Sequence, residues 1–191
     1  MTIQILAATI SDIPAMVVLS CLKRKAYEQA QPIFWKYKEG AEKAQEAWFT
    51  ELLSDDRYIM LVASAHHHEE LQACEAGRGD PKNINKKMDC RVGQWPPRKD
   101  GIEGFIIGKV IPAPEVYDPG GLTLMIDDFC VKDDNWQDMG VKLIDQIKLI
   151  AQDKGVTQLV VVSGDHDGTK CLFLEQIGLS VASRWYVGEA K

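Results

Sequence analysis

The chain has 191 residues, of which 46% are hydrophobic and 26% are charged, as in ordinary globular proteins of about one domain. Its formal net charge of −6 argues against nucleic acid as a partner, because a protein that binds phosphates along a duplex needs a dense basic face. No apolar run reaches the roughly 18 residues of a membrane span, and residues 1–4 lack the basic start of a signal peptide. We therefore expect neither a nucleic-acid nor a membrane partner, and a cytoplasmic location.

Two strands and two helices are predicted in the first third of the chain. Residues 3–6 alternate between apolar and polar types, and residues 58–64 form a strongly apolar run, so both segments predict strands. Asp12 followed by Pro14 predicts the start of a helix, and the segment 31–35 interrupts it. A second helix is predicted over residues 41–53, with four side chains along one side: Ala41, Ala44, Trp48 and Leu52.

The segment 65–100 loses all periodicity and contains many glycine and proline residues. A stretch of this length without regular structure is uncommon inside a compact domain, so we interpret it as a flexible insertion between two sheet strands. It begins with a histidine run, 66–68, and contains Cys74 and Cys90. Adjacent histidines point in different directions and match no zinc-ligand spacing, so we expect an exposed polar loop and no metal.

Regular patterns return after the insertion. Strands are predicted over residues 102–111, 122–131, 156–162 and 181–187. Helices are predicted over residues 139–154, ended by Gly155, and from Asp167 onward, ended by Gly178. The order of elements predicts a single α+β domain over residues 1–191 with a mixed sheet, in which the 139–154 helix connects two parallel strands.

The segment from residue 124 to residue 143 predicts a strand, a polar turn and the start of a helix. The first turn of a helix has backbone N–H groups without partners, and the helix dipole makes that end attractive to anions. Gly140 lets a diphosphate approach the backbone, and Lys142 adds a positive charge beside it. The alternative is that Gly140 only allows the helix to pack closely against the sheet.

Four motifs resemble the GNAT superfamily of acetyl-CoA-dependent N-acyltransferases. Residues 126–131 (IDDFCV) resemble its fourth strand, especially the acidic form found in diamine acetyltransferases, and 137–142 (QDMGVK) resemble its Gln/Arg-x-x-Gly-x-Gly/Ala loop. Residues 8–13 resemble its opening, and residues 173–179 resemble its late Phe-Tyr-Glu-Lys-x-Gly-Phe segment. The resemblance implies a three-layer fold with a mostly antiparallel, twisted sheet of about six or seven strands and about four helices, and it implies acetyl-CoA as cofactor.

The resemblance also assigns residues to the cofactor. The backbone of Phe129 and Val131 is expected to pair with the pantetheine arm like an added strand, and a backbone N–H near Cys130 is the natural oxyanion donor. Asp167 stands where many GNAT proteins carry a cofactor-contacting Asn, although it is also a natural helix N-cap. The loop expected to hold the diphosphate comprises Gln137, Asp138, Met139, Gly140, Val141 and Lys142.

Asp127 is our candidate for the general base, as in diamine acetyltransferases. Consecutive strand residues point to opposite faces, so Asp127 and Asp128 are not expected to face the same site. The alternative is that one aspartate caps the following turn and the other is solvated. A carboxylate whose pKa is raised by burial can assist an ammonium group to lose its proton near pH 7.

The usual general acid of the family is missing from this sequence. Leu174, whose side chain cannot donate a proton, occupies the position of the tyrosine that is often taken to protonate the departing thiolate. Cys171 and Tyr186 are candidate replacements, and bound water is another. Both side chains are also natural core residues.

Phe34, Trp35 and Tyr37 lie in the region that commonly forms the acceptor pocket of GNAT proteins, or else they form a lid over the core. The leading hypothesis is an N-acetyltransferase that acts on a primary amine of a small molecule or on an exposed amino group. The second is a catalytically weak GNAT-fold protein that binds acyl-CoA as a sensor or structural ligand. The third is an interaction module that docks through the 65–100 insertion. The resemblance also allows a homodimer, because final strands often pair in this fold.

Overall fold

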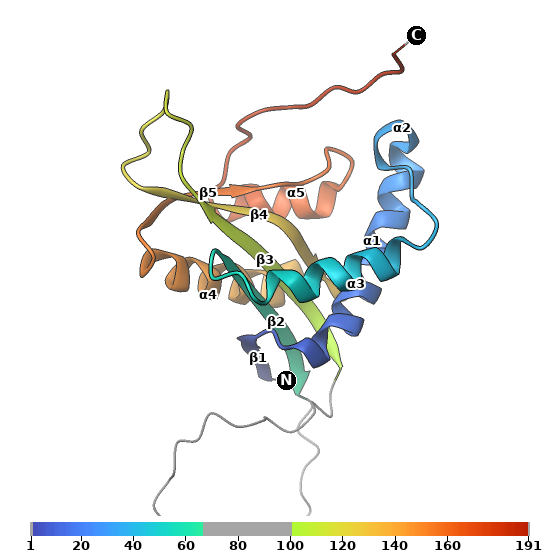
Figure 1. Cartoon of the computed structure of the whole chain (residues 1–191), viewed down its shortest axis with the longest axis horizontal. Helices are drawn as coiled ribbons and strands as arrows, with labels where there is room; N and C mark the ends of the chain where they lie inside the picture. The colour runs from blue at the N-terminus through green and yellow to red at the C-terminus, as the bar shows by residue number, and fades with distance from the viewer. Residues whose placement is uncertain (1, 67–100, 191) are drawn as a thin grey trace, which may run out of the picture.

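A computed structural model describes residues 2–66 and 101–190 of the chain (Figure 1). Its sheet has the strand order β1-β2-β3-β4-β5. Each of the pairs β1–β2, β2–β3 and β3–β4 is antiparallel, and the pair β4–β5 is parallel. The strands are β1 (Thr2–Ala7), β2 (Tyr58–His66), β3 (Ile102–Ile111), β4 (Leu122–Val131) and β5 (Val156–Val161). The expected mixed α+β fold is confirmed. The expected insertion, with Cys74 and Cys90, lies outside the described residues except at its edges.

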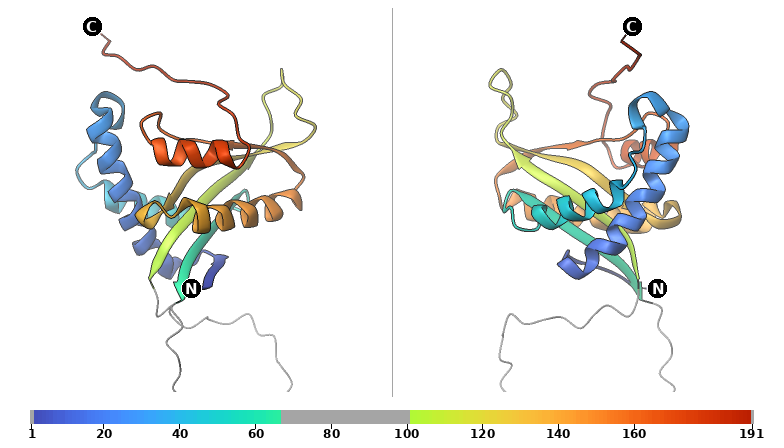
Figure 2. Two further views of the ribbon diagram at one scale, coloured as in Figure 1. Left: turned by 180° about the vertical axis from the view of Figure 1, so that it is seen from behind. Right: turned by 45° about the vertical axis from the view of Figure 1, so that its right-hand side comes forward.

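Helices cover both faces of the sheet, with α1 and α3 on one side and α4 and α5 on the other (Figures 1 and 2). The helices are α1 (Ile13–Ala30), α2 (Pro32–Trp35), α3 (Ala41–Leu52), α4 (Val141–Gln152) and α5 (Gly168–Gln176). Three short turns are η1 (Ile10–Asp12), η2 (Lys132–Asp134) and the π-helical η3 (Trp136–Gly140). The long helix predicted from residue 139 therefore begins at Val141, after a wider turn. Within the described ranges, no helix has the length and apolar character needed to cross a bilayer.

Each face of the sheet carries its own core. On the α1 and α3 side, Met16 and Phe49 pack with Phe105, and the two phenylalanine ring centroids lie 5.9 Å apart. The side predicted for α3 is confirmed at Leu52 and wrong elsewhere: Gln45 and Phe49 are its other buried residues, whereas Trp48 is 39% exposed. Phe49 determines the rotation of this helix because its ring fills the space above the sheet. Leu143 and Ile147 of α4 belong to the second core, as their helical spacing predicts.

The β4–α4–β5 unit positions the region of interest. Gly155 adopts a φ of +79° after α4, a conformation that favours glycine, and its carbonyl accepts a hydrogen bond from Leu122 N at the start of β4. β5 then pairs with β4 up to Ile126 and Val161, and Val162 N donates to Ile126 O at 2.8 Å. β4 continues beyond this point while β5 ends. We call this place, beyond the Ile126–Val161 pair, the β4–β5 opening.

A β-bulge lies at the start of the β4–β5 opening. Ile107 of β3 pairs with Asp128, and the next β3 residue, Gly108, pairs with Ile126, so Asp127 is an extra residue in β4. A bulge bends its strand and increases the local twist. The bend directs the end of β4 away from β5.

The strand predicted over residues 181–187 is absent, so the described part of the sheet has five strands rather than about six or seven. The C-terminal segment after α5 leaves the body of the molecule (Figure 1). Trp185 is 85% exposed and Tyr186 is 91% exposed. An alternating sequence specifies a strand only where a neighbour supplies hydrogen bonds and one face becomes buried, and neither condition holds for this segment.

Candidate active site

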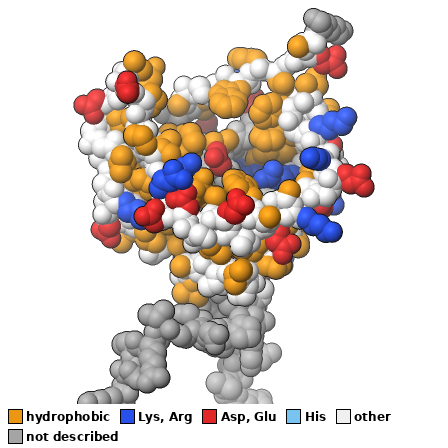
Figure 3. Space-filling view, viewed as in Figure 1, with side chains coloured by type: hydrophobic (Ala, Val, Ile, Leu, Met, Phe, Trp, Pro, Cys, Tyr) orange, Lys and Arg blue, Asp and Glu red, His pale blue; other side chains and the backbone are white. Residues whose placement is uncertain are grey.

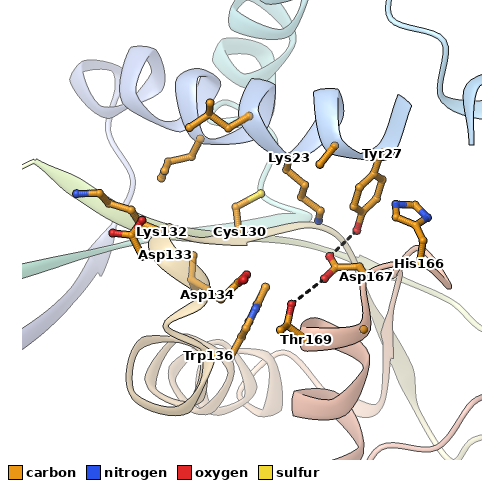
Figure 4. A pocket seen from close by; sticks show the side chains of 15 residues that line it. Lys23, Tyr27, Cys130, Lys132, Asp133, Asp134, Trp136, His166, Asp167 and Thr169 are labelled. Atoms are coloured by element: carbon orange, nitrogen blue, oxygen red, sulfur yellow. Dashed lines mark hydrogen bonds between the residues drawn. The ribbon is translucent and has the colours of Figure 1, made fainter. Parts of the chain in front are cut away.

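A cavity of about 440 Å³ lies between α1, the end of β4, the turn η2 and the start of α5. Figure 3 shows the face that carries α1 and α3, where apolar side chains surround a hollow and acidic and basic side chains are mixed. Figure 4 shows the lining at close range, with Lys23 extending from α1 into the space between Cys130 and Asp167. Lys132 and the carboxylates of Asp133 and Asp134 also line it. The cavity therefore combines an apolar wall with both signs of charge.

Two lysines from opposite faces of the sheet meet in the β4–β5 opening. Lys23 of α1 donates from Nζ to the carbonyl oxygen of Phe129 at 3.1 Å. Lys170 of α5 is fully buried and donates from Nζ to the carbonyl oxygen of Val162 at 2.9 Å. The two amino groups lie close enough for each to influence the pKa of the other. Side chains from the two helix layers can meet only where the sheet is open.

The hydrogen bond from Lys23 to Phe129 shows which backbone groups of β4 face the opening. The carbonyl of Phe129 faces it, since it accepts from Lys23. In an antiparallel ladder the residues alternate between facing the partner strand and facing away from it, so Val131 shares the orientation of Phe129 and Cys130 faces β3. This orientation agrees with the predicted pairing of Phe129 and Val131 with an extended ligand arm, and the pairing itself stays a prediction.

The two lysines have different pKa values because their neighbouring groups differ. Burial in the core, together with the charge of Lys23, lowers the pKa of Lys170 to about 7. Burial also opposes the charge on Lys23, but Cys130, Tyr27 and Asp128 outweigh it and raise the pKa of Lys23. The pair thus holds one proton firmly and a second that titrates near neutral pH.

Cys130 lies beside both lysines and is 4% exposed. Burial raises the pKa of its thiol, although Lys23 acts in the opposite direction. The group therefore stays a thiol at neutral pH, which is the unreactive form of cysteine.

The two aspartates of β4 have different surroundings. Asp128 is 8% exposed and lies 3.7 Å from the guanidinium of Arg24, measured from Oδ1 to Nη2. Asp127 is more exposed, and partial burial together with the charge of Asp128 raises its pKa. Simple alternation does not describe this pair, because the bulge at Asp127 interrupts the regular pleat. Neither aspartate is among the described residues that line the cavity.

Asp167 connects α5 to α1. Its carboxylate accepts from Lys170 N at 3.2 Å, which confirms that it is the N-cap of α5, and from the hydroxyl of Tyr27 at 2.9 Å (Figure 4). Burial, with a further contribution from Asp167, raises the pKa of Tyr27 to about 12, so the phenol stays protonated. The ring of His166 lies edge-on to Tyr27 with centroids 4.4 Å apart. These contacts fix one wall of the cavity.

The turn predicted to hold a diphosphate is tightly packed at its centre. The amides of Met139 and Gly140 donate to Asn135 O at 3.1 and 3.2 Å. A Cβ on Gly140 would lie 3.1 Å from Trp136 and 3.3 Å from Phe173, which supports the alternative that this glycine is needed for packing. The other positions of the turn are not enclosed: Gln137 donates to the side chain of Gln176, Val141 is half-buried, and Asp138 and Lys142 are exposed. Diphosphate binding at this turn remains a prediction.

Trp136 also lines the cavity and places the polar N–H of its indole ring beside it. Its indole Nε1 is buried and, within the described part of the chain, has no hydrogen-bond partner. An unpaired buried N–H is costly, and an acceptor atom of a ligand would remove that cost. The residues present thus suit an extended ligand that carries acceptor oxygens.

The candidate acids from the sequence lie apart from the cavity lining. Leu174 is buried in the core below the sheet. The sulfur of Cys171 lies 3.5 Å from Gly164 O and 3.7 Å from Ser163 Oγ, at the end of β5. Tyr186 lacks the strand that was expected to position it, and its side chain is in solvent.

The predicted acceptor aromatics divide into two groups. Trp35 packs edge-on against Tyr27 with centroids 5.2 Å apart, and Phe34 packs on Trp35. The hydroxyl of Tyr37 instead lies 3.3 Å from Cys21 Sγ, beside the core under α1 and α3. Trp35 thus adjoins the cavity wall through Tyr27, whereas Tyr37 does not.

Sequence reasoning missed Lys23 and Lys170. A signal exists for Lys170, because it precedes Phe173 and Leu174 by three and four residues and so shares their buried helix face. Lys23 stands four residues before Tyr27 on the same helix, at the edge of a buried stripe. A lysine on an apolar helix face is rare unless its charge is paired or neutralised.

The architecture identifies the fold class. A mostly antiparallel sheet with a single parallel pair, opened beside a bulge and covered by helices on both faces, is the fold of GNAT acetyltransferases. Solved structures agree. An aminoglycoside antibiotic 6′-N-acetyltransferase from Acinetobacter baumannii is 9% identical, with a TM-score of 0.62 over 100% of this chain and 99% of that one.

Two further structures have the same fold. A predicted acetyltransferase with acetyl-CoA from Clostridium acetobutylicum is 12% identical, with a TM-score of 0.61 over 98% and 96% of the two chains. A ribosomal-protein-alanine N-acetyltransferase from Brucella melitensis is 15% identical, with a TM-score of 0.57 over 99% and 100%. No protein-family model and no curated protein matches the sequence. The chain therefore has the GNAT fold, as its motifs led us to expect.

Proposed function

We propose that this protein is an N-acetyltransferase that transfers an acetyl group from acetyl-CoA to a primary amine of a small molecule or to an exposed amino group. The observation that carries the proposal is the β4–β5 opening. There the backbone of Phe129 faces an ammonium group beside a cavity of about 440 Å³. An open strand edge next to a cavity is suited to an extended ligand that pairs with the backbone.

Acetyl-CoA, when bound, supplies an acyl group activated as a thioester. Phe129 and Val131 hold its pantetheine arm through their backbone groups in this proposal, with Cys130 between them and Asp167 at the far wall. Trp136 offers its unpaired indole N–H to an acceptor oxygen. The turn Gln137–Lys142 carries the diphosphate, with the exposed Lys142 as its positive charge.

Asp127 removes a proton from the acceptor ammonium, directly or through a water molecule. Its raised pKa suits this role, because a base is most effective when its pKa is close to the working pH. Its position at the bulge places it where β4 leaves β5. Asp128 contributes the negative charge that raises the pKa of Asp127, while Arg24 holds Asp128 in place.

The acceptor is a cationic amine in this proposal. The carboxylates of Asp133, Asp134 and Asp167 line the cavity, and the chain as a whole has a net charge of −6. Both features attract a cation at low ionic strength. We retain the cytoplasm as the proposed location, with no nucleic-acid or membrane partner, and a homodimer as the proposed assembly.

One observation favours a second candidate function, a GNAT-fold protein that binds acyl-CoA without rapid turnover. Leu174, at the position of the usual tyrosine, is buried in the core and has no proton to donate.

Thiol release from acetyl-CoA with a panel of amines, followed with a thiol reagent, separates the two candidates. An enzyme releases free CoA only with its acceptor. A binder shows a rise in melting temperature with acetyl-CoA and no release with any amine. Calorimetry that detects no heat with CoA or acetyl-CoA would refute both.

A further inference from the structure

The β4–β5 opening contains a charged side chain, Lys23, that has no chemical role in the proposed reaction. Lys23 lines the cavity, and its ammonium group lies 3.1 Å from the Phe129 carbonyl. It is held there by two contacts, with the strand carbonyl and with the ring of Tyr27 at 5.1 Å. It is therefore a fixed positive charge beside the strand edge on which the proposed ligand arm lies.

We propose that Lys23 stabilises the thiolate of CoA as it departs, as a fixed positive charge beside the sulfur. The inference rests on the proposed function, since it needs acetyl-CoA in the β4–β5 opening. It replaces the tyrosine that the resemblance would place at Leu174 with a positive charge from the opposite face of the sheet. No hydroxyl at residue 174 is then required.

The acceptor nitrogen bonds to the acyl carbon, the carbon–sulfur bond breaks, and its electron pair stays on sulfur beside the ammonium group of Lys23. The thiolate then takes up a proton from water. After Asp127 has removed the first proton from the acceptor ammonium, the nitrogen loses a second proton to water in becoming an amide, so Lys23 keeps its charge throughout the cycle.

The surroundings of Lys23 keep it ready for this role. The groups that face the lysine pair are Cys130, Asp127 and Asp128 of β4, Tyr27 of α1, and Asp167 of the α5 N-cap. Cys130 and Tyr27 stay protonated because burial raises the pKa of each. The bond from Lys23 to the Phe129 carbonyl holds the ammonium group at the opening. The firmly held proton of the pair thus resides on the lysine that reaches the cavity.

A fixed ammonium that stabilises the departing thiolate must also stabilise it in the product complex. The test compares CoA with desulfo-CoA, which lacks the sulfhydryl group, by calorimetry at pH 7 and pH 9. An ordinary thiol has a pKa of about 8.5, and lowering it by about one unit in the complex makes the preference for CoA over desulfo-CoA rise about fivefold to tenfold between these pH values. We expect this rise in the unaltered protein.

Lys23→Met removes the charge while keeping most of the chain length, and we expect it to abolish the rise in preference. Lys23→Arg keeps the charge and is expected to retain it. Lys132→Met is the matched control, because Lys132 lines the same cavity and its loss is expected to leave the rise unchanged. Circular dichroism and thermal melting verify that each variant is folded.

The outcomes separate the two proposals. If both ligands bind and the rise is the same in Lys23→Met as in the unaltered protein, Lys23 does not stabilise the thiolate and the proposed function stands. If the rise is lost equally in Lys132→Met, the effect belongs to the general field of the cavity and the assignment to Lys23 is refuted. If neither ligand binds, the proposed function fails, and the role of Lys23 fails with it.

Discussion

Replacing the fully buried Lys170 with methionine should stabilise the protein at neutral pH. Burial and Lys23 lower the pKa of Lys170 from its ordinary value of 10.5 to about 7. At about 1.4 kcal/mol per pH unit, keeping this residue in the core costs roughly 5 kcal/mol at and below pH 7. Lys170→Met removes that cost, but it leaves the Val162 carbonyl without its partner at a cost of about 1–3 kcal/mol. We expect a net gain of roughly 2–4 kcal/mol.

The pH dependence is the diagnostic part of this prediction. Between pH 7 and 10.5 the unfolded chain binds more protons than the folded one at this residue, so the stability of the unaltered protein rises with pH there. The advantage of Lys170→Met should therefore shrink by about 1.4 kcal/mol per pH unit above pH 7 and vanish between about pH 8.5 and pH 10. Urea unfolding at several pH values measures it, with the exposed Lys25→Met as control. A difference that is constant with pH would show that Lys170 is charged in the folded protein, and would refute the reasoning.

Three further predictions concern the candidate site and its supports. Asp127→Asn should lower turnover with an accepted amine by about a hundredfold or more while CoA affinity changes little; unchanged turnover in a steady-state assay would reject Asp127 as the base. Gly140→Ala should destabilise the protein by roughly 1–3 kcal/mol in urea unfolding without ligand, because a Cβ there would press on two aromatic rings. Gly188→Ala is the control and should change the stability little, because a Cβ there meets nothing within 4 Å. Asp167→Ala should cost about 1–2 kcal/mol through the lost N-cap, against no measurable change for the exposed Asp165→Ala; equal melting temperatures for these two variants would contradict the capping role.

Local patterns in the sequence predict most of the secondary structure. The strand at 102–111 and the strand at 122–131 have the predicted bounds, because both contain long apolar runs between turn residues. The helix N-cap at Asp167 and the stop at Gly155 follow from the local needs of the backbone. The segment 181–187 fails for the converse reason, because its strand depends on a neighbour that no local pattern reveals.

The candidate site depends on contacts between residues far apart in the chain. The bond from Lys23 to Phe129 joins residues 106 positions apart, and the bond from Tyr27 to Asp167 joins residues 140 positions apart. Motif spacing locates β4 and the turn that follows it, but it cannot show that a bulge at Asp127 opens the sheet to both helix layers. Periodicity does mark Lys170 as a charged residue on a buried face, and only the fold shows that Lys23 is its neighbour.

The bulge at Asp127 connects these features physically. If β4 continued without it, the regular pleat would keep Asp127 and Asp128 on opposite faces and let the end of β4 stay beside the line of β5. Lys23 and Lys170 would then lie on separate sides of a closed sheet, each a buried charge without relief, which a core does not tolerate. With the bulge, the two amino groups face the same opening and satisfy the carbonyls of Phe129 and Val162 at its two sides. One extra residue in a strand therefore accounts for the raised pKa of a candidate base, the lowered pKa of a buried lysine, and the open strand edge on which the proposed acyl donor lies.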